Sequence, residues 1–283
     1  MIHNGNDQAA GLRRLLEGGS RRIVSIQSAA PVGELSELLL NLASALVAVG
    51  RDVLVIDAGR RTGRMALALG IDPGATLLDA ASGICAVDDA IRVSPHGFEV
   101  AVLTPPSAVV APGRIGRLDS ALRRVSDRAD ITLVGMSLRS DQGWSLPALA
   151  RGDVIVQVAN TRASVTGGYR LIKHLTARLG RRPFSILVTN ATPQQALVAG
   201  GNVARAAERY LAVAVNPIGA IPADEHVGRA ALLGRSVIDV YPRAMAAIAY
   251  RRLAIALTQP PRTRGAVAAG RSAAPSVNAK FGL

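Results

Sequence analysis

The segment SIQSAAPVGELS, residues 25–36, lies between an apolar run and a segment with helical periodicity. In chains with this order of strand, loop and helix, the loop is the usual binding place for a phosphate group. Phosphate binding uses glycines that let backbone N–H groups approach, a lysine that supplies positive charge and a Ser or Thr hydroxyl for Mg²⁺. From residue 29 to residue 36 only Gly33 and Ser36 have suitable types, and the only lysines of the chain are Lys173 and Lys280. The loop therefore stands in the position of a phosphate site without its cationic group.

Four more candidate site residues follow later apolar runs of the chain. Asp57 ends DVLVID, Asn190 follows FSILVT, and Pro222 and Asp224 follow the run that ends at residue 221. Ligands of parallel α/β sheets lie beyond the carboxyl ends of the strands, so these residues are expected at the same edge as the loop. Their types are also typical of helix caps, turns and salt bridges, and we favour that structural interpretation.

Metal and thiol chemistry is not indicated by the sequence. The histidines and Cys85 show no metal-ligand spacing, and the histidines are interpreted as surface or loop residues. With a single cysteine, no disulfide can form within the chain, which is typical of a reducing cytoplasm. No apolar run approaches the roughly 18–20 residues of a membrane-spanning helix, and the first residues lack a signal-peptide pattern. We predict a cytoplasmic protein without a metal.

Alternating strand and helix patterns must position these candidate residues. Short apolar runs predict strands at 22–27, 52–57, 98–104, 131–134, 153–158, 184–189 and 213–221. Apolar residues at helical spacing predict helices at 35–49, 113–126, 164–179, 194–211 and 243–257. Continuously apolar strands separated by helices are typical of a parallel sheet buried on both faces. The predicted fold is therefore α/β, with a mainly parallel, doubly wound sheet and helices on both faces.

Composition divides the chain into three parts. Residues 1–20 are predicted to form a partner-binding helix followed by a glycine-rich hinge. Residues 21–258 are predicted to form the α/β domain. Residues 259–283 are rich in Pro, Arg, Gly, Ala and Ser, and this composition predicts a disordered tail.

Several segments together resemble the MinD/ParA class of P-loop ATPases. The segments are NLASALVAVGRDVLVIDAG, MALALGIDPGATLLDAASG, RASVTGGYRLIKHL, ILVTNAT and IGAIPADEHVGRA, and the resemblance covers residues 22–257. It implies a MinD-like P-loop NTPase fold, with ATP and Mg²⁺ as the family's cofactors. It also places Asn190 and residues 222–224 where the family has its contacts on the adenine side.

The N-terminal segment DQAAGLR narrows this resemblance. It is similar to the DQAxxLR element of the FlhG family, also called FleN, whose members regulate flagellar number and placement. In that family the element contacts the flagellar GTPase FlhF and stimulates its hydrolysis. Asp7 can cap a short helix, Gln8 and Arg13 can make directional hydrogen bonds, and Ala9 and Leu12 share an apolar stripe. We expect these five residues to bind an FlhF-type GTPase.

The family's phosphate loop is degenerate in this chain. The family pattern KGGxGK[ST], laid onto the segment that ends at Ser36, puts Ala30 and Leu35 at its two lysines. Pro31 removes a backbone donor, and Glu34 sets a carboxylate against the charge of a phosphate. The loop has therefore lost both the positive charge and the pliant backbone that bind a triphosphate.

Two further motifs have lost acidic residues. The family's DxD motif becomes Asp57-Ala58-Gly59, and Gly135 stands where the family has a magnesium partner. Arg60, Arg61 or Arg64 could supply phosphate-binding charge, but not the loop geometry and the metal ligand as well. We therefore predict no catalytic residues, no ATP or Mg²⁺ cofactor and no ATP hydrolysis. The vestigial nucleotide site comprises Gly33, Ser36, Asp57, Asn190, Pro222 and Asp224.

The formal net charge of +13 raises nucleic acid and anionic membranes as partners. The basic residues are scattered in short pairs without interleaved aromatic residues, a pattern that argues against nucleic-acid binding. In the last predicted helix, Met245, Ile248, Leu253 and Leu257 are expected to pack on the sheet. Membrane association, at the inner membrane or the cell pole, therefore has only weak support.

Together these features predict a non-hydrolysing, FlhG-like regulator of flagellar assembly, number or placement that acts through protein contacts. The partners implied by the resemblance are an FlhF-type GTPase and, as further candidates, flagellar basal-body components or a flagellar transcription activator. Two alternatives stay open. One is an active MinD/ParA-type ATPase with an atypical phosphate loop, and the other is a basic, DNA-associated ParA-like protein.

Overall fold

The computed structural model describes residues 21–59, 65–66, 69–72, 74–105, 108–137 and 146–259. The predicted partner-binding element within residues 1–20 lies outside the described residues. The same holds for the arginines at 60, 61 and 64 and for residues 260–283 of the predicted tail. The predictions for these segments stay predictions.

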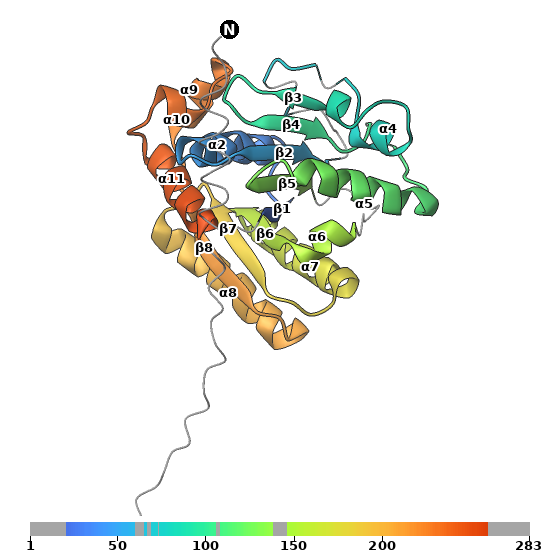
Figure 1. The fold of residues 1–283 in the computed structure, drawn as a ribbon. Coiled ribbons are helices and arrows are strands. Elements are labelled where there is room, and N and C mark those ends of the chain that lie inside the picture. Colours follow the sequence, from blue (N-terminus) through green and yellow to red (C-terminus); the bar gives the residue numbers. More distant parts are fainter. Residues whose placement is uncertain are drawn as a thin grey trace, which may run out of the picture.

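Eight strands form one sheet in the described part of the chain (Figure 1). Their order is β3-β4-β2-β5-β1-β6-β7-β8; β3 runs antiparallel to β4, and all other neighbours are parallel. The strands are β1 (Arg22–Ser28), β2 (Val53–Asp57), β3 (Ile91–Val93), β4 (Glu99–Val102), β5 (Ile131–Ser137), β6 (Asp153–Ala159), β7 (Phe184–Thr189) and β8 (Val215–Ile221). The mainly parallel sheet confirms the predicted α/β fold, whereas the antiparallel edge strand β3 was not predicted.

Helices cover both faces of this sheet (Figure 1). One layer consists of α2 (Glu34–Ala48), α9 (Glu225–Leu232), α10 (Val237–Val240) and α11 (Met245–Thr258). The other layer consists of α4 (Leu77–Ala81), α5 (Pro112–Ser126), α6 (Pro147–Arg151), α7 (Arg162–Leu179) and α8 (Pro193–Leu211), with the short 3₁₀ helix η1 (Asp88–Ala90) at its edge. Among the described helices, none is both long enough and apolar enough to cross a membrane.

The strand β2 shows why the apolar runs are continuous rather than alternating. Val53 and Val55 pack into the apolar cluster that contains α2 and α11, while Leu54 and Ile56 pack into the cluster that contains α4, α5 and α6. Successive side chains of a strand point to opposite faces, so a strand covered on both sides needs apolar residues at every position. The doubly wound arrangement follows from this pattern.

Helix α11 differs from the prediction in the side that it buries. Leu253 and Leu257 are buried as expected, together with Tyr250, and this spacing defines one face of a helix. Met245 and Ile248 are 68% and 38% exposed, so the prediction that they pack on the sheet is wrong. They point away because the helix meets α2 through the face that carries Tyr250.

Candidate functional site

The loop between β1 and α2 uses its backbone donors within the protein. Ala29 donates its N–H to the carbonyl of Gln157 on β6 at 2.9 Å, and Ala30 donates its N–H to the hydroxyl of Ser28 at 3.2 Å. The N–H of Glu34 donates to a carbonyl within the loop at 3.3 Å. A phosphate-binding loop turns such groups toward its ligand. These three N–H groups have protein partners instead.

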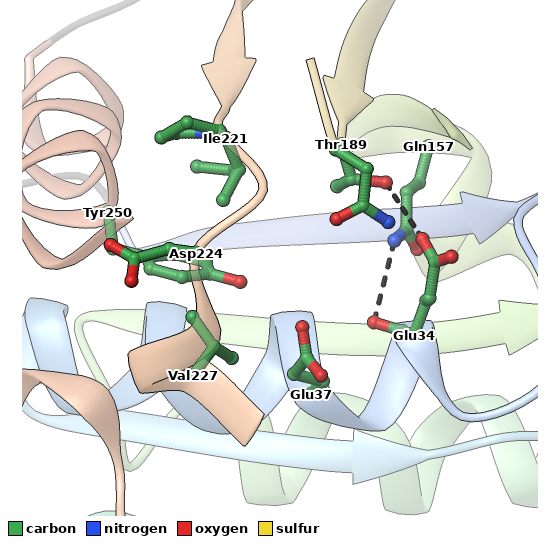
Figure 2. A pocket seen from close by; sticks show the side chains of 10 residues that line it. Glu34, Glu37, Gln157, Thr189, Ile221, Asp224, Val227 and Tyr250 are labelled. Atoms are coloured by element: carbon green, nitrogen blue, oxygen red, sulfur yellow. Dashed lines mark hydrogen bonds between the residues drawn. The ribbon is translucent and has the colours of Figure 1, made fainter. Parts of the chain in front are cut away.

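A small pocket lies where this loop enters α2 (Figure 2). Its walls come from the first turn of α2, from β6, from the end of β7 and from the segment that leads from β8 to α11. The lining residues are Glu34, Glu37, Gln157, Thr189, Asn190, Ile221, Pro222, Asp224, Val227 and Tyr250. The pocket has a volume of about 30 Å³, which admits roughly one water-sized group.

Glu34 closes the side of the pocket that faces β6 and β7. The hydroxyl of Thr189 donates to its Oε2 at 3.0 Å, and Nε2 of Gln157 donates to its backbone carbonyl at 3.4 Å (Figure 2). A helix N-terminus carries partial positive charge and favours an anion nearby. At α2 that anion is the protein's own glutamate.

The pocket is acidic. Partial burial and the neighbouring charge of Glu34 raise the pKa of Glu37 above its ordinary value of 4.5. Burial also raises the pKa of the Tyr250 hydroxyl, with a further contribution from Glu37. Among the described residues that line the pocket there is neither an arginine nor a lysine. The arrangement therefore favours positive groups over negative ones.

Asp224 uses its carboxylate to join two helices. It is the N-cap of α9, where its Oδ1 accepts the N–H of His226 at 3.0 Å and contacts Nδ1 of the same residue at 2.7 Å. Its Oδ2 accepts the N–H of Ala246, in the first turn of α11, at 3.0 Å. Burial raises the pKa of Asp224, but these hydrogen bonds outweigh burial and leave that pKa below its usual value. Asp224 is thus committed to fixing α9 against α11.

The predicted vestigial site is only partly brought together. Asn190, Pro222 and Asp224 line the pocket, whereas Gly33, Ser36 and Asp57 do not. Gly33 is the N-cap of α2 with a φ of 105°, and Ser36 lies in the first turn of that helix.

Asp57, the last residue of β2, pairs with Gly135 on the neighbouring strand β5. Asp57 is buried at the end of β2, and its carboxylate accepts the N–H groups of Gly59 at 3.1 Å and Met65 at 3.3 Å. A Cβ placed on Gly135 would lie 2.4 Å from Cδ1 of Leu39 on α2. Helix α2 therefore covers the position where an acidic side chain was expected from the family pattern.

Four polar residues that line the pocket were not predicted from the sequence: Glu37, Gln157, Thr189 and Tyr250. Glu37 follows Glu34 by one helical turn, a spacing that could have marked a shared acidic face. Gln157 and Thr189 are polar residues near the ends of apolar strands, a signal of a ligand edge in parallel sheets. Tyr250 gave no such signal, since its place depends on how α11 packs.

A second hollow, of about 380 Å³, lies at the opposite edge of the sheet, where β1 and β6 begin. Four arginines line it: Arg21, Arg22, Arg123 and Arg151. Arg22 pairs with Asp153 at 2.6 Å, and Arg123 pairs with Asp119 at 2.6 Å. These ion pairs neutralise part of the positive charge at this edge.

The comparisons with known proteins agree with this architecture. No protein-family model matches the chain. The solved MinD in the MinC:MinD complex of Aquifex aeolicus superposes with a TM-score of 0.65 at 18% identity, covering 86% of this chain and 99% of that chain. The antiactivator FleN of Pseudomonas aeruginosa PAO1 is 30% identical over 221 residues, which cover 76% of this chain and 78% of FleN. The chain belongs to the MinD/ParA family of P-loop ATPases.

A second relative matches this chain over a similar length. An uncharacterized ATP-binding protein of Methanocaldococcus jannaschii is 28% identical to this MinD/ParA-family chain over 222 residues, or 77% of this chain and 80% of the relative.

Among the described residues, no three His, Cys, Asp or Glu side chains are placed to hold a metal ion.

Proposed function

We propose that this chain is a FleN-like regulator of flagellar assembly, number or placement that does not hydrolyse ATP and acts through protein contacts. The observation that carries the proposal is the placement of Glu34. Its carboxylate, bonded to Thr189 at 3.0 Å, stands at the first turn of α2, where a family member would hold phosphate charge. A phosphate bound at this turn would lie close to the Glu34 carboxylate, and two negative charges at close range repel each other strongly in a partly buried site.

The proposal includes neither ATP nor Mg²⁺ as a cofactor. A pocket of about 30 Å³ is far below the roughly 300–1,000 Å³ of sites for drug-sized ligands. Glu34 and Glu37 add negative charge, and the described lining has no basic side chain. Asp57, the remaining acidic residue of the DxD position, already accepts two backbone N–H groups of its own loop. The residues present do not fit the family's cofactor.

The partners follow from the resemblance. The element at residues 7–13 would contact an FlhF-type GTPase, and the name antiactivator carried by FleN supports a flagellar transcription activator as a second partner. Basal-body components are a third candidate. Leu232 and Met245 are 89% and 68% exposed, and large exposed apolar side chains are suited to protein contacts. We place the protein in the cytoplasm, with partners bringing it to the inner membrane or the cell pole.

Isothermal titration with Mg·ATP, together with a phosphate-release assay, tests the nucleotide part of the proposal. We expect neither a binding heat nor turnover for the full chain. The ATP-binding relative from Methanocaldococcus jannaschii, measured in the same buffer, is the positive control. Micromolar binding with turnover would overturn the proposal in favour of an active ATPase with an atypical loop. Steeply salt-dependent binding to nonspecific duplex DNA would instead favour the ParA-like alternative.

Removal of residues 1–19 tests the partner part. The rate of GTP hydrolysis by an FlhF-type GTPase is measured with the full chain, with the shortened chain and with Gln8→Ala. We expect the shortened chain to lose its stimulation while its melting temperature is unchanged, and Gln8→Ala to lose part of it. Arg21→Ala, just outside the element, is the matched control and should stimulate fully. Unchanged stimulation by the shortened chain would refute the assignment of this element.

A further inference from the structure

The pocket at the start of α2 contains a buried acceptor without a donor. Gln157 is 0% exposed on β6, and its Oε1 has no hydrogen-bond partner in the described part of the chain. Exchanging the two amide atoms would bring Oε1 against the carbonyl oxygen of Glu34, so the hydrogen-bond network determines the orientation. Buried acceptors are almost always satisfied, which makes this oxygen a binding group for a ligand that donates.

The carboxylates of Glu34 and Glu37 lie in the same pocket, and no basic side chain among its described lining residues neutralises them. Figure 2 shows Glu37 pointing from α2 into the space below Asp224 and Thr189, and Glu34 beside Gln157. Glu34 accepts one hydroxyl donor, and within the described residues the Glu37 carboxylate accepts no hydrogen bond. Their mutual repulsion contributes to the raised pKa of Glu37, and a cation between them would relieve it.

The size of the pocket selects among cations. Its volume of about 30 Å³ matches a group as large as one water molecule. A primary ammonium has this size and offers three N–H donors, whereas a guanidinium is a wider, planar fork with five. A divalent metal ion is disfavoured, because no three acidic or histidine side chains among the described residues converge on one point.

We propose that this pocket binds a primary ammonium group, the tip of a lysine side chain on a protein partner, between Glu34, Glu37 and Oε1 of Gln157. The chain itself has two lysines. Lys173 is exposed on α7, which contributes no residue to the pocket, and Lys280 lies outside the described residues. The inference goes beyond the proposed function, and it does not depend on which flagellar protein is bound.

Titration of the ¹⁵N-labelled full chain with n-butylammonium chloride tests the proposal by nuclear magnetic resonance. The reporters are the side-chain amide of Gln157 and the backbone amide of Thr189. Tetramethylammonium chloride has the same charge but no N–H donor, and it is titrated at matched ionic strength. We expect saturable shifts of both reporters with n-butylammonium and an affinity about tenfold lower for tetramethylammonium.

Three variants decide whether the response comes from this pocket. Glu37→Gln keeps the shape of the side chain and should weaken n-butylammonium binding about tenfold, since it removes one carboxylate charge. Glu208→Gln, an exposed glutamate on α8, is the matched control and should leave the affinity unchanged. Lys280→Met should also leave it unchanged, and tighter binding in that variant would overturn the assignment to a partner.

Equal binding of the two ammonium ions, or an affinity that Glu37→Gln does not change, would overturn the proposal. This result can be told apart from a failure of the proposed function, because the ammonium titration contains no nucleotide. A chain that hydrolysed ATP would refute the proposed function and leave the ammonium test unaffected.

Discussion

The hydroxyl of Thr189, at the end of β7, donates to the carboxylate of Glu34, in the first turn of α2, across 3.0 Å. The two residues are 155 positions apart in the chain, and the bond ties the loop after β1 to the far half of the sheet. Helix α2 thus begins at a glutamate that is held by a neighbouring strand. A bond of this kind stabilises the fold and at the same time holds negative charge at the start of α2.

Thr189→Val should destabilise the protein, because it removes the donor while keeping the shape of the side chain. A hydrogen bond to a charged group contributes about 1.5–3 kcal/mol, so we expect a loss of about 1–2 kcal/mol in the free energy of unfolding at this half-buried site. Urea denaturation measures it. Thr176→Val, which removes a hydroxyl bond to the backbone within α7, is the matched control and should cost less. A cost that is unchanged in a Glu34→Gln background would contradict the role of Glu34.

Glu37→Gln should stabilise the protein at neutral pH and have no effect in acid. The folded-state pKa of Glu37 lies above 4.5, so the folded protein binds more protons than the unfolded chain as the pH rises through this window. The wild type therefore has its full stability below the unfolded pKa and loses part of it as the pH rises through the folded pKa.

Thermal melting of wild type and Glu37→Gln between about pH 4 and pH 8 measures this effect. The difference in melting temperature should grow from zero in acid to a plateau near neutrality. Glu208→Gln, on the exposed face of α8, should show no such trend. A difference that is the same at every pH would mean that Glu37 acts through packing rather than through its charge.

The fold could be predicted from the sequence because the core strands appear as short, continuous apolar runs. A strand such as β2 is buried at every residue, and only a doubly covered parallel sheet demands that pattern. The edge strand β3 has three residues and none is buried, so it is too short to show the buried apolar run that identified the core strands. Helix α11 is apolar on more than one face, which is why its exposed residues Met245 and Ile248 could not be told from its buried ones.

The site could be predicted only in part. The missing lysines and the presence of Glu34 are matters of residue type, and a single sequence is enough to read them. The hydrogen-bond partners of Glu34 cannot be read from the sequence in this way. Gln157 and Thr189 lie 123 and 155 positions away from it in the chain, and only the register of the sheet brings them close to it. A pocket built from such long-range contacts needs the three-dimensional structure.

Gly33→Ala should destabilise the start of α2. The residue has a φ of 105°, which strains any side chain with a Cβ, and we expect a loss of about 1–2 kcal/mol in the free energy of unfolding. Gly116→Ala is the matched control: Gly116 lies inside α5 with open space around it, and alanine there should stabilise by about 0.5–1 kcal/mol. Urea denaturation of the two variants should give opposite signs, and a stabilising Gly33→Ala would contradict the geometry of this loop.

Gly135→Ala tests how closely α2 packs on β5. The added Cβ would lie 2.4 Å from Cδ1 of Leu39, so that side chain must move, and overpacking of this kind costs about 1–3 kcal/mol. Leu39→Ala alone leaves a cavity in the core and should cost about 2–5 kcal/mol. In the double variant the methyl group enters the space that the leucine vacated. Its total cost should therefore be smaller than the sum of the two single costs by about 0.5 kcal/mol or more. Strictly additive costs in urea denaturation would show that Leu39 does not occupy the space above Gly135.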